Sequence, residues 1–97
     1  MITIKLYRYG EDVVLAAADK SLLGKTMREG EMKLEVSPSF YEGEDGTEEM
    51  LSNRLELATV ANLVGEETVS IAVKHKYVDE ECVLTIDGVP HAQMVKI

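Results

Sequence analysis

The sequence predicts an α+β fold, in which a mostly antiparallel sheet of about six strands carries two helices packed on one face. Three observations predict it: strand and hairpin patterns recur over residues 2–36, helical spacing follows over 47–76, and strand patterns return after residue 82. Strands and helices that are segregated along the chain favour a layered α+β architecture. A length of 97 residues with 45% apolar content fits a single domain over residues 1–97.

The first third of the chain predicts two hairpins. Residues 2–9 alternate Ile, Ile and Leu with polar side chains, and the apolar run 13–18 follows after turn residues. These two strands are expected to pair with each other. Asp19 suits the start of a short helix or turn, because its carboxylate can cap free backbone N–H groups. Residues 26–36 then predict the second hairpin.

The segment that follows is expected to be irregular. Residues 37–41 contain Ser and Pro and predict a capped turn, with Phe40 directed into the core. Residues 42–46 are polar and rich in glycine, so we expect them to form the most mobile loop of the chain.

Two helices are predicted next. The first spans 47–65, capped near Thr47, and its inward stripe is Met50, Leu51, Leu55, Ala58 and Ala61. Gly65 ends it, and a second helix starts at Glu66, with Val69, Ala72 and Val73 facing inward. Acidic residues near each start and basic residues at 74–76 match the helix dipole.

Two strands are expected to complete the sheet. Residues 82–86 predict one strand, Asp87 and Gly88 break it, and residues 93–97 predict the last. Pro90 lies between them and predicts a rigid turn, with the Val89–Pro90 peptide open to either isomer.

Charge limits the partners that the chain can take. The net charge is −8, and residues 1–33 carry six basic groups against five acidic, whereas residues 34–97 carry four against 13. Such an acidic surface repels phosphate backbones and disfavours non-specific nucleic-acid binding, and it is typical of a soluble protein. A local basic strip on the first third stays open as an RNA contact; its members are Lys20, Lys25, Arg28 and Lys33.

The cysteine count and the first residues indicate the compartment. Cys82 is the single cysteine, so the chain has no internal disulfide. The first residues predict a strand and contain no long apolar run. We therefore expect a cytoplasmic protein with no membrane partner.

Motifs for cofactors and metals are weak. Gly24–Lys25–Thr26 matches the end of a phosphate-binding loop, but Asp19 stands where the motif needs glycine and a strand follows. His75, His91 and Cys82 lack ligand spacing on any one element. We expect no cofactor and no metal.

A candidate binding group remains. Asn62 is a poor residue for the interior of a helix, so its amide either bonds backbone at a turn or contacts a ligand. His91 follows Pro90 and either bonds loop carbonyls or serves in acid–base or phosphate contact. The candidate ligand-binding residues are Lys25, Arg28, Asn62, His91 and Gln93.

Four segments together resemble a known family. They are DKSLLGKTMREG over 19–30, Phe40–Tyr41, ANLVGE over 61–66 and GVPHAQ over 88–93. In order and spacing they are similar to the archaeal family called domain of unknown function 424, except that Met27 stands where that family more often has an aromatic residue. The resemblance implies an archaeal, cytoplasmic protein and a role connected with translation or RNA, with no established activity.

Three functions are therefore kept open. The first is a non-catalytic binding module for a macromolecular partner, either protein or RNA. The second is a small-molecule enzyme in which His91 is the acid–base and Lys25 or Arg28 orients an anionic substrate. The third is RNA contact through the basic strip. Exposed edge strands also make a homodimer plausible.

Overall fold

The computed structural model describes residues 1–96, and its elements alternate more than the sequence predicts. The strands are β1 (Ile2–Tyr9), β2 (Asp12–Asp19), β3 (Thr26–Glu29), β4 (Met32–Glu35), β5 (Glu44–Gly46), β6 (Val60–Val64), β7 (Leu84–Ile86) and β8 (Val89–Val95). The helices are α1 (Pro38–Tyr41), α2 (Glu48–Leu57) and α3 (Glu66–Lys74), with 3₁₀ turns η1 (Lys20–Leu22) and η2 (Glu80–Cys82).

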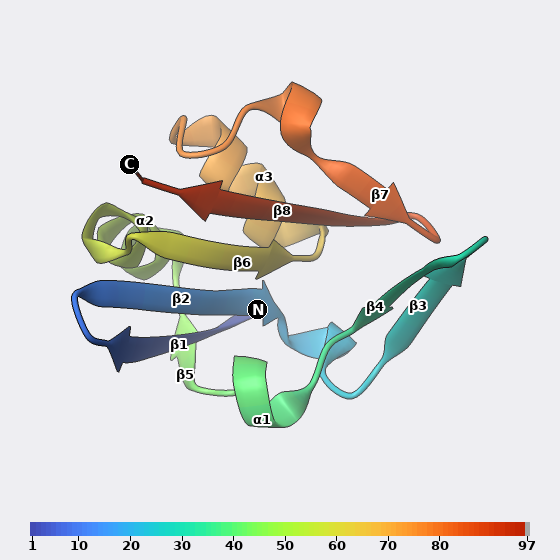
Figure 1. Cartoon of the computed structure of the whole chain (residues 1–97), viewed down its shortest axis with the longest axis horizontal. Coiled ribbons are helices and arrows are strands. Elements are labelled where there is room, and N and C mark those ends of the chain that lie inside the picture. Colours follow the sequence, from blue (N-terminus) through green and yellow to red (C-terminus); the bar gives the residue numbers. More distant parts are fainter. Residues whose placement is uncertain (97) are drawn as a thin grey trace.

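Six strands form one sheet in the order β5-β1-β2-β6-β8-β7, as Figure 1 shows. Every neighbouring pair is antiparallel except β2 and β6, which run parallel. Strands β3 and β4 pair only with each other, as a separate antiparallel hairpin. The predicted mostly antiparallel sheet of six strands is confirmed.

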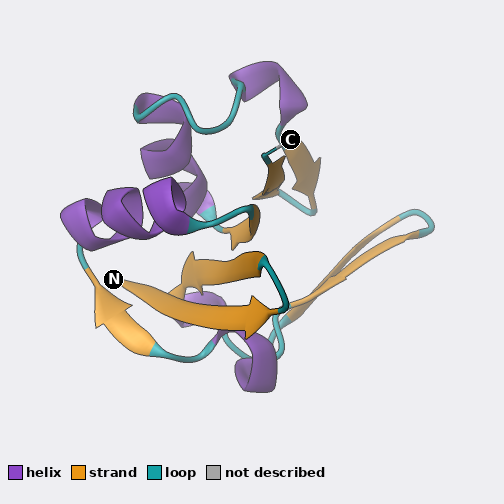
Figure 2. Ribbon diagram, turned by 60° about the vertical axis from the view of Figure 1, so that its left-hand side comes forward, coloured by secondary structure: helices purple, strands orange, loops and turns teal. Residues whose placement is uncertain are grey.

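Helices α2 and α3 cover one face of the sheet, whereas α1 and the β3–β4 hairpin lie on its other side (Figure 2). The predicted packing of two helices on one face is confirmed. No helix within residues 1–96 has the length and apolar character needed to cross a membrane.

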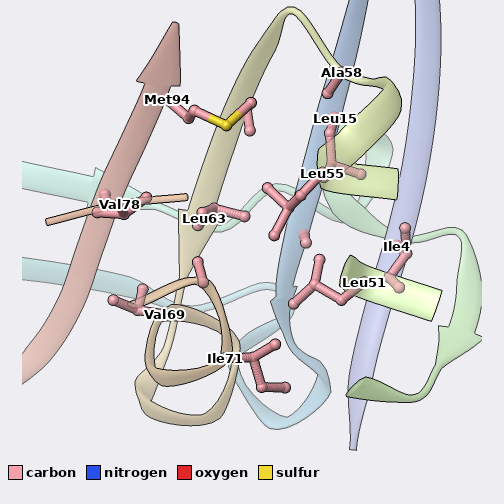
Figure 3. Close-up of a cluster of buried hydrophobic side chains, with 14 of the residues drawn as sticks. Ile4, Leu15, Leu51, Leu55, Ala58, Leu63, Val69, Ile71, Val78 and Met94 are labelled. Atoms are coloured by element: carbon pink, nitrogen blue, oxygen red, sulfur yellow. The ribbon is translucent and has the colours of Figure 1, made fainter. Parts of the chain in front are cut away.

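The larger core lies between the sheet and the two long helices (Figure 3). Leu15 and Leu63 enter it from the sheet and Leu51 and Leu55 from α2, and all four side chains have no exposed surface. Burying a leucine completely stabilises the folded chain by about 1.5–3 kcal/mol. This cluster therefore fixes α2 and α3 on the sheet.

A second core lies on the opposite face. The hairpin contributes Met27 and Leu34 to it, packed near Ala18 and Val64 of the sheet. Phe40 packs against this cluster and is partly buried, while Tyr41 beside it is buried. Met27 pairs with Leu34 across the hairpin, so the hairpin directs this pair toward the sheet and its other side chains away from it.

The largest correction concerns the predicted helix 47–65. Helix α2 ends at Leu57, and residues 60–64 form β6 in the middle of the sheet. Ala61 is buried as predicted, but it reaches the core from a strand. Spacing by three residues over 55, 58 and 61 is typical of a helix, but pairing with β2 and β8 makes residues 60–64 a strand.

Other corrections lie at the sheet edge and in the last strand. Residues 44–46 form edge strand β5, where the sequence predicts a mobile loop. The turn predicted around Pro90 is also wrong, because Pro90 lies inside β8 and its peptide bond is trans. The predicted last strand thus begins earlier, at Val89, and its final residue, Ile97, lies outside the described residues.

The connection from β6 to α3 depends on Asp19. Its carboxylate accepts hydrogen bonds from the backbone N–H groups of Glu67 and Thr68 at 3.1 and 2.8 Å and from the Thr68 hydroxyl at 2.8 Å. Gly65 precedes the helix with φ of +107°, and a Cβ there would lie 2.3 Å from the Asp19 Cγ. The prediction that Asp19 caps the element directly after it is wrong, because its side chain makes no cap at η1 and instead caps α3, which is distant in sequence.

Candidate functional site

Part of the sheet on the side opposite α2 and α3 is left uncovered. Cross-strand register places Tyr7, Val14, Val60 and Val95 in one row over four strands. Tyr7, Val14 and Val60 are half-buried, whereas Val95 is 67% exposed. We call this surface the open face and define it as Tyr7, Tyr9, Asp12, Val14, Val60, Asn62, Gln93 and Val95.

An aromatic ladder runs along one end of the open face. The Tyr7 ring lies 5.3 Å from the Phe40 ring and 6.1 Å from the Tyr9 ring, and both pairs are nearly parallel. The Tyr7 hydroxyl donates to the carbonyl oxygens of Phe40 and Ser39 at 2.7 and 3.2 Å. Helix α1 therefore fixes Tyr7, and Tyr9 ends the ladder with 63% of its surface exposed.

Asn62 and Gln93 form a polar pair beside the apolar row. They lie opposite each other on β6 and β8, and Gln93 Nε2 donates to Asn62 Oδ1 at 2.9 Å. With this assignment of the amides, the Asn62 NH₂ group and the Gln93 carbonyl oxygen keep the capacity for further hydrogen bonds. The expected turn position of Asn62 is wrong, because it is a strand residue, but its proximity to Gln93 brings two predicted site residues together.

His91 lies on the same face of β8 as Gln93, two residues earlier. It is opposite Val64 on one side and Leu84 on the other, and it is half-buried. Burial lowers the pKa of His91 below its ordinary value of 6.5, so the imidazole is neutral at pH 7. Its side chain makes no hydrogen bond with any group of residues 1–96, so no neighbour orients it for acid–base work.

The lowered pKa of His91 predicts a pH-dependent stability. Unfolding restores the ordinary pKa, so the unfolded chain binds more protons once the pH falls to about 6.5. The contribution of His91 to the free energy of unfolding is complete above that pH and declines as the pH falls through 6.5 toward the lower folded-state pKa. Urea denaturation at pH 7.5 and 5.5 should show a smaller decline for His91→Gln than for the parent chain. An equal decline in both would contradict this assignment.

The basic candidates do not join this group through any contact. Arg28 lies opposite Lys33 in the strand register of the hairpin, and both side chains are on the side turned away from the sheet. Lys25 precedes β3, and its exposed side chain makes no hydrogen bond or ion pair within residues 1–96. In the proposed basic strip, Lys20 pairs with Asp45 at 2.7 Å and Lys33 lies 3.9 Å from Glu35.

The other histidine belongs to an ion cluster between the long helices. Glu48 at the start of α2 accepts from Lys74 Nζ and contacts His75 Nε2, both at 2.8 Å, at the end of α3. The hydrogen bonds from Lys74 and then His75 lower the pKa of Glu48. The cluster is exposed and links two helix ends, so we assign it to packing of the helices.

Comparison with known proteins places the chain in a family. The family model described as Protein of unknown function (DUF424) matches residues 7–97. The chain belongs to the DUF424 family. This confirms the resemblance carried by the four sequence segments. No protein with a curated description matches the chain.

A solved structure has the same fold as this DUF424 chain. It is the crystal structure of an uncharacterized conserved protein from Methanopyrus kandleri, with a TM-score of 0.82 and 26% sequence identity. The match covers 96% of this chain and 89% of that one. The fold is therefore shared by another protein, one described as uncharacterized.

Sequence reasoning missed most of the open face of this DUF424 chain. Tyr7 and Tyr9 were assigned only to strand alternation, and Val60 to a helix. Residues 60–64 carry only an ambiguous signal, because Asn62 is their single polar residue. A short apolar run suits a buried strand and a helix segment alike.

Proposed function

We propose that this DUF424 chain is a non-catalytic binding module whose open face docks a protein partner. The observation that supports it is an apolar row across four strands, next to an amide pair, on the part of this face that α1 and the β3–β4 hairpin leave open. Protein interfaces bury about 800 Å² on each partner and their centres are poor in charged residues. Asp12, at the margin, is the one charged residue of the open face.

Two alternatives are less well supported. The enzyme hypothesis needs His91 to act on a proton, but its register partners are the apolar residues Val64 and Leu84. Within residues 1–96, no hydrogen bond links its ring to Lys25 or Arg28.

The RNA hypothesis needs a basic surface, whereas the net charge of the chain is −8. Two of the four residues in the basic strip, Lys20 and Lys33, also lie beside carboxylates. Cytoplasmic residence is part of the proposal, as is an archaeal source, which the Methanopyrus relative supports.

Affinity capture with matched variants tests this proposal. We expect Tyr9→Ser combined with Val95→Ser to retain at least about tenfold less of a partner than the parent chain, because truncating aromatic anchors costs over about 1.4 kcal/mol. Both side chains are exposed, so the variant should fold normally. The measurement is quantitative mass spectrometry of proteins captured at low salt from a lysate of the source organism.

The control is Leu57→Ser, which removes a 60% exposed leucine from α2 on the other side of the sheet. It should retain the partner fully. Equal retention by all three forms would place binding elsewhere, and a clean monomer with nothing attached would contradict the binding module itself. Loss of the captured material after nuclease treatment would favour RNA.

A further inference from the structure

The free end of the aromatic ladder is the most accessible part of the open face. Tyr9 stacks on Tyr7 through one ring face, and Tyr9 is 63% exposed. No other aromatic ring or cation of residues 1–96 contacts Tyr9. The ring faces of tyrosine are negatively polarised, so an exposed face attracts planar cations such as guanidinium.

A carboxylate lies on the neighbouring strand. Asp12 is opposite Tyr9 in the β1–β2 register, on the same face of the sheet. Its Oδ1 accepts a hydrogen bond at 3.0 Å from the Thr59 hydroxyl, which also lies 3.2 Å from the Val13 carbonyl oxygen. Within residues 1–96 its other oxygen has no partner, and Asp12 is exposed. An aromatic face and a carboxylate are the two groups that an arginine engages together.

The surrounding charges favour a cationic partner group at this end. Glu11 lies in the adjoining turn and adds a second exposed carboxylate. The neighbouring Arg8 leaves β1 on the opposite face, because side chains alternate along a strand. The Lys5 ammonium group lies over Tyr7 and not Tyr9, 5.2 Å from the Tyr7 ring centroid, and it donates to the Ser39 carbonyl oxygen at 3.2 Å. The net charge of −8 attracts positively charged partners over a longer range.

We infer that the protein partner of the open face presents an arginine that stacks on Tyr9 and pairs with Asp12, next to apolar side chains that cover Val14, Val60 and Val95. The inference rests on the proposed function and adds to it the chemistry of the partner. Lysine would supply the charge without the planar group, so arginine is the side chain that uses both the ring and the carboxylate.

Two short peptides test this inference on the full chain. The probes are acetyl-Leu-Arg-Val-Arg-Leu-amide and its counterpart with glutamine in place of both arginines. Titrations followed by NMR of valine methyl groups should show the arginine peptide binding at least about fivefold more tightly, with shifts at Val14, Val60 and Val95. Asp12→Asn, which keeps the oxygen that bonds Thr59, should reduce this preference to less than about twofold.

Asp79→Asn is the matched control, since it removes one negative charge from an exposed site far along the chain. It should leave the preference unchanged. A preference that falls equally in both variants would mean general charge attraction and would overturn the inference, as would failure of the arginine peptide to bind. If both peptides shift the same valines equally, the binding face stands and the arginine is wrong. Shifts that depend on protein concentration without peptide would identify a second copy as the occupant.

Discussion

Gly65→Ala should lower the free energy of unfolding by about 3 kcal/mol or more. A residue with a side chain at φ of +107° costs about 1–3 kcal/mol in backbone strain. The added Cβ would also lie 2.3 Å from the Asp19 Cγ and would displace the carboxylate that caps α3, which costs about 1–2 kcal/mol more. Urea denaturation monitored by far-UV circular dichroism measures the change.

The control for Gly65→Ala is Gly24→Ala. Gly24 also has a positive φ, +83°, but a Cβ there meets no atom within 4 Å, so about 1 kcal/mol is expected. Asp19→Ala should cost about 1–2 kcal/mol in the parent chain but much less when Gly65→Ala is already present, because both changes remove the same cap. Equal effects of the two glycine variants would contradict the close contact between Asp19 and Gly65.

Leu55→Ala should lower the free energy of unfolding by about 2–5 kcal/mol. Leu55 has no exposed surface and lies in the centre of the larger core, between α2 and the sheet (Figure 3). Truncating it removes apolar contacts and leaves a cavity that the surrounding side chains fill only in part. Thermal and urea denaturation at pH 7.5 measure the loss.

Leu57→Ala is the matched control, because it makes the same chemical change two residues away in the same helix. Leu57 is 60% exposed, and a change within about 0.5 kcal/mol is expected. Comparable losses in the two variants would mean that α2 packs with a different face toward the sheet.

The fold class could be predicted from sequence because most elements carry an unambiguous period. Alternation over 2–9 and the apolar run 13–18 fixed the first hairpin, and the spacing of Val69 and Ala72 fixed α3. Strand β6 could not be placed, because it is short and Ala61 continues the helical spacing of Leu55 and Ala58. Its strand form comes from pairing with β2 and β8, which are distant in sequence.

The candidate site was predictable only in part. Asn62, His91 and Gln93 share one face of the sheet. Their polarity suggests a common site from sequence, but the shared face could not be derived without knowing that residues 60–64 form β6. The charge of Arg28 suggests a binding role, but pairing within the hairpin turns its side chain away from the sheet. Sequence reasoning missed Tyr9 and Asp12 because their role depends on side-chain exposure, which only the folded structure shows.

Methyl NMR of the valine-labelled chain with its captured partner tests the central claim most directly. Val14, Val60 and Val95 report on the open face, and Val69 of α3 and Val78, which are both buried in the larger core, serve as internal references. The account predicts that adding the partner shifts the first three signals and leaves the two references in place. Shifts confined to the references, or to Val36, which follows the β3–β4 hairpin, would contradict it.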